Sequence, residues 1–203
     1  MEREKALDVA YGVAAGLDPA FVQLEVAGSI RRLEPEVKDV ELVGIPRLRP
    51  TQVDLFTTED RPFVDEALAD LVTWGVLTWD QEVKRNGPKY KRLIHVASGL
   101  VIDLFLAQPE NYGLQMALRT GPRDFCKLMV MQPQKHGGRG AMPLGMRMDG
   151  GFLWRNGQRL DTPTEEAFFA ALDVPCWPPE QRSARRLQEW LDLNAKWERG
   201  RVD

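Results

Sequence analysis

The sequence predicts an α+β fold, in which a mixed or antiparallel sheet is flanked by helices. Alternating apolar and polar residues, typical of half-buried strands, occur at residues 22–26, 77–79 and 90–96. Apolar residues at helical spacing occur at residues 2–16 and again in the C-terminal third. A chain of 203 residues is long enough to bury a substantial core, in one large domain or two small ones.

The composition is that of a globular protein, with 43% apolar and 28% charged residues. The apolar runs are much shorter than the roughly 20 residues of a membrane-spanning helix, and the N-terminus lacks a signal-peptide pattern. The two cysteines, Cys126 and Cys176, belong to no Cys/His cluster. We therefore expect a cytoplasmic protein without structural zinc and without contact to a membrane.

The charge is unevenly distributed along the chain. The net charge of the whole chain is −3, but the segment from Lys84 to Arg147 holds eleven basic and three acidic residues, a balance of +8. A basic segment of this size favours an acidic partner such as nucleic acid.

Residues 2–16 are predicted to form an amphipathic helix that packs over the sheet and ends at Gly16. The strand at residues 22–26 then ends in Gly28-Ser29. Because glycine has no Cβ, a phosphate could approach the backbone closely at this turn.

The next strand carries two acidic residues, in the order Asp39-Val40-Glu41. Residues two apart in a strand point to the same face, so both carboxylates are expected side by side with Val40 turned to the core. Two like charges this close are unfavourable unless a cation lies between them. Paired carboxylate oxygens suit Mg²⁺, so Asp39 and Glu41 are candidate metal ligands.

A Gly-Ser turn followed by Asp-x-Glu, at the spacing between Ser29 and Asp39, resembles the nucleotidyltransferase superfamily that includes DNA polymerase beta. The pair Arg31-Arg32 after Gly28-Ser29 is similar to the family X DNA polymerases in particular. The resemblance covers roughly residues 20–185. The alternative is an ordinary strand with solvated acids after a turn.

Downstream, the prolines in residues 44–50 predict an irregular connection. Residues 62–74 are predicted to form a helix with Pro62 in its first turn. Asp54 lies near an apolar run without a same-face acidic partner. We therefore predict a structural role for it.

Residues 77–96 are predicted to form a hairpin with Asn86-Gly87 at its turn. The basic tip of this hairpin could contact a phosphate backbone. Alternatively, the hairpin lies at the edge of a sheet, and its charged residues protect that edge from aggregation. The predicted nucleic-acid contacts are Lys84, Arg85, Lys89, Lys91, Arg92 and, further along the chain, Arg123.

Ser98-Gly99 turns the chain into a third strand, in which Asp103 interrupts an apolar run. A buried lone carboxylate is expensive to keep charged. It becomes favourable if Asp103 lies beside Asp39 and Glu41 and completes a metal site. The sequence around Asp103, Val-Ile-Asp-Leu, also resembles the third-carboxylate strand of family X.

In the second half of the chain, the resemblance implies that Thr120 and Gly121 contact the sugar of an incoming nucleotide and that Lys127 lies on its base side. It also suggests a cis peptide bond before Pro122. A small hairpin is predicted at Asn156-Gly157 and a helix capped by Thr164. A last helix is expected at about 179–198, with Arg182, Arg185 and Arg186 on its solvated face.

The resemblance implies a nucleotidyltransferase palm at residues 1–107, with the N-terminal helix packed on it, and a small α/β thumb-like subdomain at 108–203. We expect no lyase and no fingers domain, a minimal palm-plus-thumb form as in viruses. Such a protein would be a monomer that works distributively in a bacterial or virus-infected cell.

The activity implied by the resemblance is that of a DNA-directed DNA polymerase that fills short gaps in DNA repair. Two Mg²⁺ ions, with Mn²⁺ as a substitute, would be held by Asp39, Glu41 and Asp103 and would promote attack of a primer 3′-OH on a dNTP. Gly28, Ser29 and Arg32 would bind its phosphates. The alternatives are a template-independent transferase, one acting on RNA or another acceptor, and a non-catalytic nucleic-acid-binding protein.

Overall fold

The computed structural model describes residues 1–54, 56–83, 85–133 and 140–199, with side chains described as far as residue 194. Within these residues the predicted α+β fold is confirmed, with seven α-helices, a five-stranded mixed sheet and two small antiparallel sheets. The chain divides into two compact units, Met1–Pro109 and Glu110–Asp203. The division falls close to the boundary expected at residues 107 and 108.

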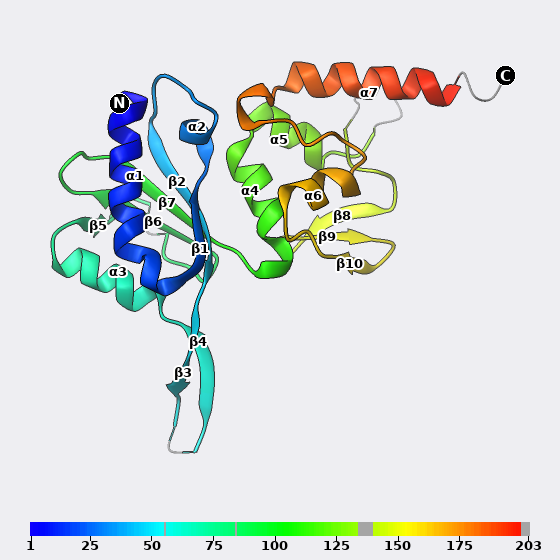
Figure 1. The fold of residues 1–203 in the computed structure, drawn as a ribbon. Coiled ribbons are helices and arrows are strands. Elements are labelled where there is room, and N and C mark those ends of the chain that lie inside the picture. Colours follow the sequence, from blue (N-terminus) through cyan, green and yellow to red (C-terminus); the bar gives the residue numbers. More distant parts are fainter. Residues whose placement is uncertain (55, 84, 134–139, 200–203) are drawn as a thin grey trace. The chain divides into compact units, whose positions relative to one another are not determined.

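The first unit is built on the five-stranded sheet, whose strands lie in the order β1-β2-β7-β6-β5 (Figure 1). β2 and β7 are parallel, and the other neighbours are antiparallel. The helices and strands of this sheet region are α1 (Arg3–Leu17), β1 (Phe21–Val26), α2 (Gly28–Arg31), β2 (Asp39–Pro46), α3 (Val64–Thr73), β5 (Leu77–Trp79), β6 (Tyr90–His95) and β7 (Val101–Leu106), with a 3₁₀ turn at Asp18–Ala20.

One face of this sheet packs against α1 and α3 and forms the apolar core of the unit. Val40 and Leu42 on β2 are fully buried in this core. Because side chains alternate along a strand, Asp39 and Glu41 lie on the opposite face of the sheet. The alternation predicted for this strand is therefore confirmed.

A two-stranded sheet occupies the segment after β2. The irregular connection predicted from Pro46 and Pro50 is wrong, because β3 (Leu48–Gln52) pairs with β4 (Thr58–Pro62) as an antiparallel hairpin. Proline is tolerated at strand ends and in edge strands, and both strands of an isolated hairpin are edges. Pro62 consequently ends β4, and the predicted helix begins two residues later at Val64.

The connection between β5 and β6 turns at a different place from the predicted one. An Asn-Gly pair at the centre of a tight hairpin turn requires positive φ at both residues, and neither Asn86 nor Gly87 has it. Instead, the N–H of Gly87 donates to the carbonyl of Tyr90 at 2.9 Å, and Asn86 forms an isolated β-bridge with Lys91. The turn therefore lies at residues 87–90.

The second unit packs its helices and a three-stranded antiparallel sheet, in the order β10-β9-β8, around its own apolar core. The Asn156-Gly157 turn is confirmed, with φ of 51° and 84° at the two residues. The Thr164 hydroxyl accepts the Ala167 N–H at 3.2 Å, which confirms the predicted helix cap. The elements are α4 (Tyr112–Thr120), α5 (Arg123–Val130), β8 (Met146–Asp149), β9 (Phe152–Arg155), β10 (Gln158–Leu160), α6 (Glu165–Ala171) and α7 (Ala184–Arg199), with 3₁₀ turns at Pro109–Asn111 and Pro179–Gln181.

The prediction that Arg182 lies on a solvated helix face is wrong. Its guanidinium is buried, forms an ion pair with Glu165 at 2.6 Å and donates to the Trp177 carbonyl at 2.9 Å. α7 begins only at Ala184, so Arg182 precedes the helix and can point into the core. Arg185 and Arg186 are exposed, as predicted.

The predicted cis bond before Pro122 is also wrong, because the described residues contain no cis peptide bond. Gly121 and Pro122 are both extended and join α4 directly to α5. The trans form of an X–Pro bond is favoured by about 0.5–1 kcal/mol, and this geometry accommodates it. Among the described helices, none is long and apolar enough to cross a membrane.

Candidate functional site

Strand register brings the three predicted carboxylates to one face of the five-stranded sheet. On the parallel strands β2 and β7, Glu41 lies directly opposite Asp103, and Asp39 lies opposite Val101. Asp39 shares the face of Glu41 because the two are two residues apart on one strand. This face is opposite to the one that packs against the helices. The juxtaposition of Asp103 with Glu41 predicted from sequence is thus present in the fold.

Asp103 is held by two side chains of the neighbouring strand β6. Arg92, its antiparallel partner, donates from Nε to Oδ1 at 2.9 Å and from a terminal nitrogen to Oδ2 at 3.3 Å. The Tyr90 hydroxyl donates to Oδ1 at 2.6 Å. Burial, and then the hydrogen bond to Asp103, raise the pKa of Tyr90 to about 12, so this hydroxyl keeps its proton at neutral pH. Both oxygens of Asp103 therefore have donors within the unit.

The environment of Asp39 disfavours its charged form. Burial raises its pKa above the ordinary value, and repulsion from Asp103 raises it further, against smaller opposing effects of Arg92 and Arg32. A desolvated acid beside a like charge is the arrangement that a bound cation would relieve.

The Gly28-Ser29 turn lies directly against Glu41. Gly28 has φ of +68°, and a Cβ built at this residue would collide with the Glu41 carboxylate, so glycine is required here on both grounds. The Ser29 hydroxyl is buried, and no described residue provides it with a hydrogen-bond partner. A buried unpaired hydroxyl is unfavourable and is a feature that a ligand oxygen could satisfy. Arg32 directly follows α2, and its Nε lies 3.5 Å from a carboxylate oxygen of Glu34.

Among the described residues, no group of three or more His, Cys, Asp or Glu side chains is already arranged to hold a metal ion. Asp103 instead contacts Arg92 and Tyr90, and the Glu41 carboxylate lies over Gly28. The donor chemistry nevertheless fits a hard divalent cation, since Asp39, Glu41 and Asp103 share one face and offer only oxygen. Binding would require side-chain rotation and a partial exchange of partners at Asp103.

The basic residues predicted to contact nucleic acid are used in different ways. Lys91 is buried, forms an ion pair with Asp65 of α3 at 2.5 Å and donates to Asn86 at 2.8 Å. Arg92 holds Asp103, so neither cation is presented as an open phosphate contact. Arg85 and Lys89 are exposed, with Arg85 5.7 Å from the ring centre of Tyr90, and Lys84 lies outside the described residues.

The predicted nucleotide contacts of the second unit lie at the junction of α4 and α5. Thr120 is buried at the end of α4, whereas Lys127 and Arg123 are exposed on α5. A Cβ at Gly121 would meet the Cys126 sulfur at 2.7 Å, and that sulfur donates to the Leu118 carbonyl at 3.2 Å. These contacts pack the junction, and the predicted roles of Thr120, Gly121 and Lys127 toward a nucleotide stay predictions.

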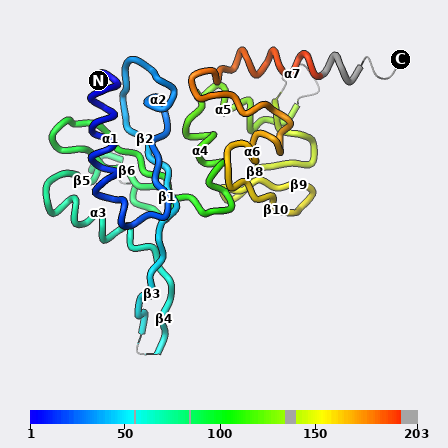
Figure 2. Tube along the Cα trace, in the orientation of Figure 1, coloured from blue at the N-terminus to red at the C-terminus, as the bar shows by residue number. Residues whose placement is uncertain are grey.

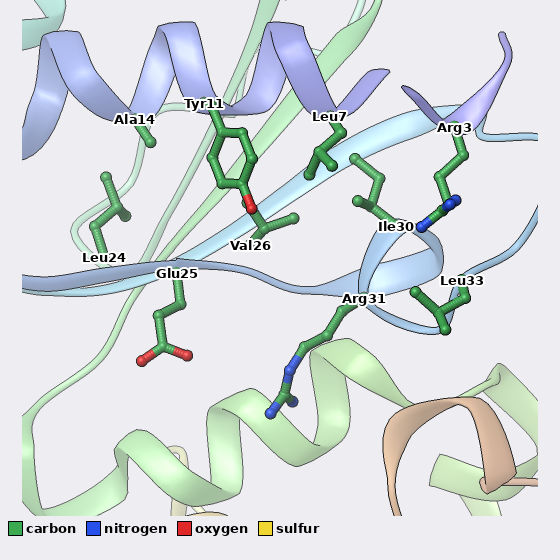
Figure 3. Close-up of a pocket in the computed structure, with 10 residues that line it drawn as sticks. All are labelled: Arg3, Leu7, Tyr11, Ala14, Leu24, Glu25, Val26, Ile30, Arg31 and Leu33. Atoms are coloured by element: carbon green, nitrogen blue, oxygen red, sulfur yellow. The ribbon is translucent and has the colours of Figure 1, made fainter. Parts of the chain in front are cut away.

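A pocket of about 400 Å³ lies between α1 and β1 (Figure 3). Tyr11 of α1 faces Leu24 and Val26 of β1, whereas Glu25 and Arg31 point away from α1. Leu24 and Val26 pack on the core beneath the helices, so the pocket lies on the face of the sheet opposite to the carboxylates.

Sequence reasoning missed the contacts of Tyr90 and Arg92 with Asp103. The Ser98-Gly99 turn indicates that β6 and β7 are neighbouring antiparallel strands, but it does not by itself give their register, because counting outward equally from it would place Arg92 opposite Phe105. The observed pairing of Ile94 with Val101 brings Arg92 opposite Asp103. Tyr90 follows two residues away on the same face. The basic neighbours of Arg92 in the sequence instead favour a surface cation.

Comparison with known proteins assigns no family. No protein-family model matches the chain, and no curated protein matches it at a significant level. The functional interpretation therefore rests on the motif residues and their arrangement.

Proposed function

We propose that this protein is a Mg²⁺-dependent nucleotidyltransferase similar to the family X DNA polymerases, which adds dNMP to a primer 3′-OH in short DNA gaps. The observation that carries the proposal is the register of β2 and β7, which pairs Glu41 with Asp103 on the face shared by Asp39. Asp103 has Arg92 and Tyr90 as partners, but Asp39 is partly desolvated beside this like charge, and the Ser29 hydroxyl is buried and unpaired. A bound cation would relieve the first of these unfavourable features, and a ligand oxygen the second.

In this proposal, each residue of the face has a distinct task. Asp39, Glu41 and Asp103 would hold Mg²⁺, which when bound neutralises the triphosphate and lowers the pKa of the attacking hydroxyl. The Ser29 hydroxyl and Arg32 bind phosphate oxygens. Arg92 and Tyr90 are positioning residues, since they act by fixing the orientation of the Asp103 carboxylate.

The second unit is proposed to act as the thumb-like part of such an enzyme. Thr120 and Gly121 would contact the sugar, and Lys127 and Arg123 would contribute positive charge toward the nucleotide and the duplex. Their exposure on α5 leaves both cations accessible to a ligand.

Primer extension tests the proposal. The protein is incubated with Mg²⁺ and each dNTP or rNTP in turn, on a duplex with a one-nucleotide gap and on a lone single strand. Addition of only the templated dNMP to the gapped duplex, absent in EDTA, is the expected result. Untemplated addition to the single strand would instead identify a terminal transferase, and no addition to either would overturn the polymerase proposal.

Gly28→Ala is expected to lower the turnover number about 10²-fold, since displacement of a catalytic group by about 1 Å has effects of this size. The new Cβ displaces the Glu41 carboxylate, and positive φ adds about 1–2 kcal/mol of strain. Gly75→Ala is the matched control, because Gly75 has φ of +71° with nothing within 4 Å of a Cβ. Urea unfolding should show the strain loss in both variants, with a further loss in Gly28→Ala from the collision with Glu41, and turnover should be reduced in Gly28→Ala alone.

Asp39→Asn is expected to raise the melting temperature of the metal-free protein at neutral pH, because burial and repulsion from Asp103 disfavour the charged carboxylate. The raised pKa of Asp39 means that its favourable contribution is complete below its ordinary pKa and is lost as pH rises through the raised value. The asparagine removes this penalty at neutral pH. Thermal melting in EDTA and in Mg²⁺ measures the effect.

Mg²⁺ should stabilise the wild-type protein and stabilise Asp39→Asn much less. Asp60→Asn, which removes an exposed carboxylate from β4, serves as the control and should melt like the wild type in both conditions. Equal stabilisation of all three proteins by Mg²⁺ would argue against a metal site at Asp39.

A further inference from the structure

The β3–β4 hairpin extends away from the five-stranded sheet of its unit (Figures 1 and 2). Near its tip, the Phe56 side chain is 96% exposed, the highest value for a large apolar side chain in the described part of the chain. Gln52 and Val53 beside it are also exposed. A fully exposed aromatic ring at the tip of an arm is unfavourable for an isolated protein and is typical of a binding anchor.

The tip is ordered by its own hydrogen bonds. Oδ1 of Asp54 accepts the N–H groups of Phe56 and Thr57, each at 2.8 Å, and the Val53 N–H donates to the Thr57 carbonyl at 2.9 Å. The bond from the Phe56 N–H is the main reason that the pKa of Asp54 is lowered, so the carboxylate stays ionised and the turn stays capped at neutral pH. The structural role predicted for Asp54 is confirmed.

The base of the hairpin is fixed to the body of the unit. The Arg49 guanidinium pairs with Glu66 of α3 and lies 5.1 Å from the ring centre of Phe63. An arm attached at its base and capped at its tip presents Phe56 in a defined position. Such preorganisation reduces the ordering cost when a partner binds.

The charge of the outer hairpin favours a protein over a nucleic acid as the partner. Residues 50–60 contain Asp54, Glu59 and Asp60 and no lysine or arginine. Glu59 pairs with Arg61 at 3.0 Å, so the uncompensated negative charge of this segment comes from Asp54 and Asp60. These two carboxylates repel DNA phosphates and anionic lipids. A tip with a glutamine amide, an aliphatic side chain and an aromatic anchor instead suits an apolar pocket bordered by polar groups.

We propose that this tip docks in the apolar pocket of a sliding clamp, the ring-shaped type of protein that encircles duplex DNA. The inference rests on the proposed DNA polymerase function. Attachment to a ring already on the duplex would raise the local concentration of the proposed polymerase at its substrate. The tip belongs to a separate sheet from the one that carries Asp39, Glu41 and Asp103, so docking leaves that face open.

The sequence of the tip fits this partner. Residues 52–56 read Gln-Val-Asp-Leu-Phe, and short segments in which a glutamine precedes an aliphatic–aromatic pair are typical ligands of such rings. Leu55 lies outside the described residues, and Gln52, Val53 and Phe56 are exposed side chains of the tip that a partner could contact.

The test measures binding of the full chain to a purified bacterial sliding clamp by calorimetry, in EDTA and without DNA or nucleotide. Wild type should bind, and Phe56→Ala and Gln52→Ala should each weaken binding about tenfold or more, as expected for anchor residues. Leu48→Ala is the matched control, because Leu48 is an apolar residue 59% exposed on the stalk, outside the tip. Circular dichroism should show all three variants folded.

Absence of binding by the wild-type chain, or equal binding by all variants, would overturn the proposal. Weaker binding of Phe56→Ala to gapped duplex DNA, with no binding of any protein to the clamp, would overturn it in favour of a DNA-inserting tip. Because the assay contains neither substrate nor metal, its result is independent of primer extension. Either proposal can therefore fail while the other stands.

Discussion

Asp103→Asn is expected to lower the rate of nucleotide addition by about 10³-fold while the chain still folds. The asparagine is nearly isosteric, and its oxygen can still accept from Tyr90, as Oδ1 of Asp103 does. What is lost is the negative charge opposite Glu41, and with it one of the three proposed metal ligands. A loss of several kcal/mol of transition-state stabilisation corresponds to a rate reduction of this size.

The accompanying loss of stability should be small. Arg92 loses its charged partner, but its side chain is 25% exposed, so water can solvate the guanidinium. Single-turnover primer extension, with folding checked by circular dichroism, measures the effect. Asp60→Asn makes the same charge change at an exposed site and should retain full activity. A rate for Asp103→Asn within tenfold of wild type would remove Asp103 from the proposed chemistry.

Glu165→Ala is expected to destabilise the second unit by about 3–5 kcal/mol, the range for leaving one partner of a buried ion pair uncompensated. The Arg182 side chain is 1% exposed and that of Glu165 is 10% exposed. The guanidinium also lies 4.9 Å from the ring centre of Phe169 and is held by the Trp177 carbonyl, so it cannot readily turn out to water. Its charge would remain in an apolar setting.

Urea unfolding, followed by tryptophan fluorescence, measures this loss. Glu189→Ala is the matched control, since Glu189 pairs with Arg185 one helical turn away, with side chains 59% and 89% exposed. An exposed pair of this type contributes less than about 1 kcal/mol. Similar losses in the two variants would show that burial of Arg182 adds nothing to the stability of the unit.

The helices and strands that could be predicted from sequence are those whose apolar residues recur with a clear helical or strand period. The helix at residues 2–16 and the strands around Asp39 and Asp103 are present because each has an apolar face that a neighbouring layer covers. The β3–β4 hairpin is not predicted from sequence, because Pro46 and Pro50 indicate an interruption of regular structure. In an isolated two-stranded sheet both strands are edges, where a missing N–H is tolerated.

The candidate site was predictable to a similar extent. The shared face of Asp39 and Glu41 follows from the two-residue period of a strand. The cost of burying a lone acid predicts that Asp103 lies beside Asp39 and Glu41. The register of β2 and β7 then places Asp103 directly opposite Glu41. The engagement of Asp103 by Arg92 and Tyr90 was not predicted, because it depends on the pairing of β6 with β7.

The sequence by itself determined the α+β class, the alternation that separates the acidic residues from the core, and the turn at Asn156-Gly157. Only the tertiary structure decided the roles of the basic side chains. Lys91 is buried against Asp65, Arg92 holds Asp103, and Arg182 pairs with Glu165, although each lies among charged residues that suggest an exposed surface. Periodicity is encoded by neighbours in the chain, whereas the burial of a long cationic side chain depends on which distant carboxylate the packing places within its reach.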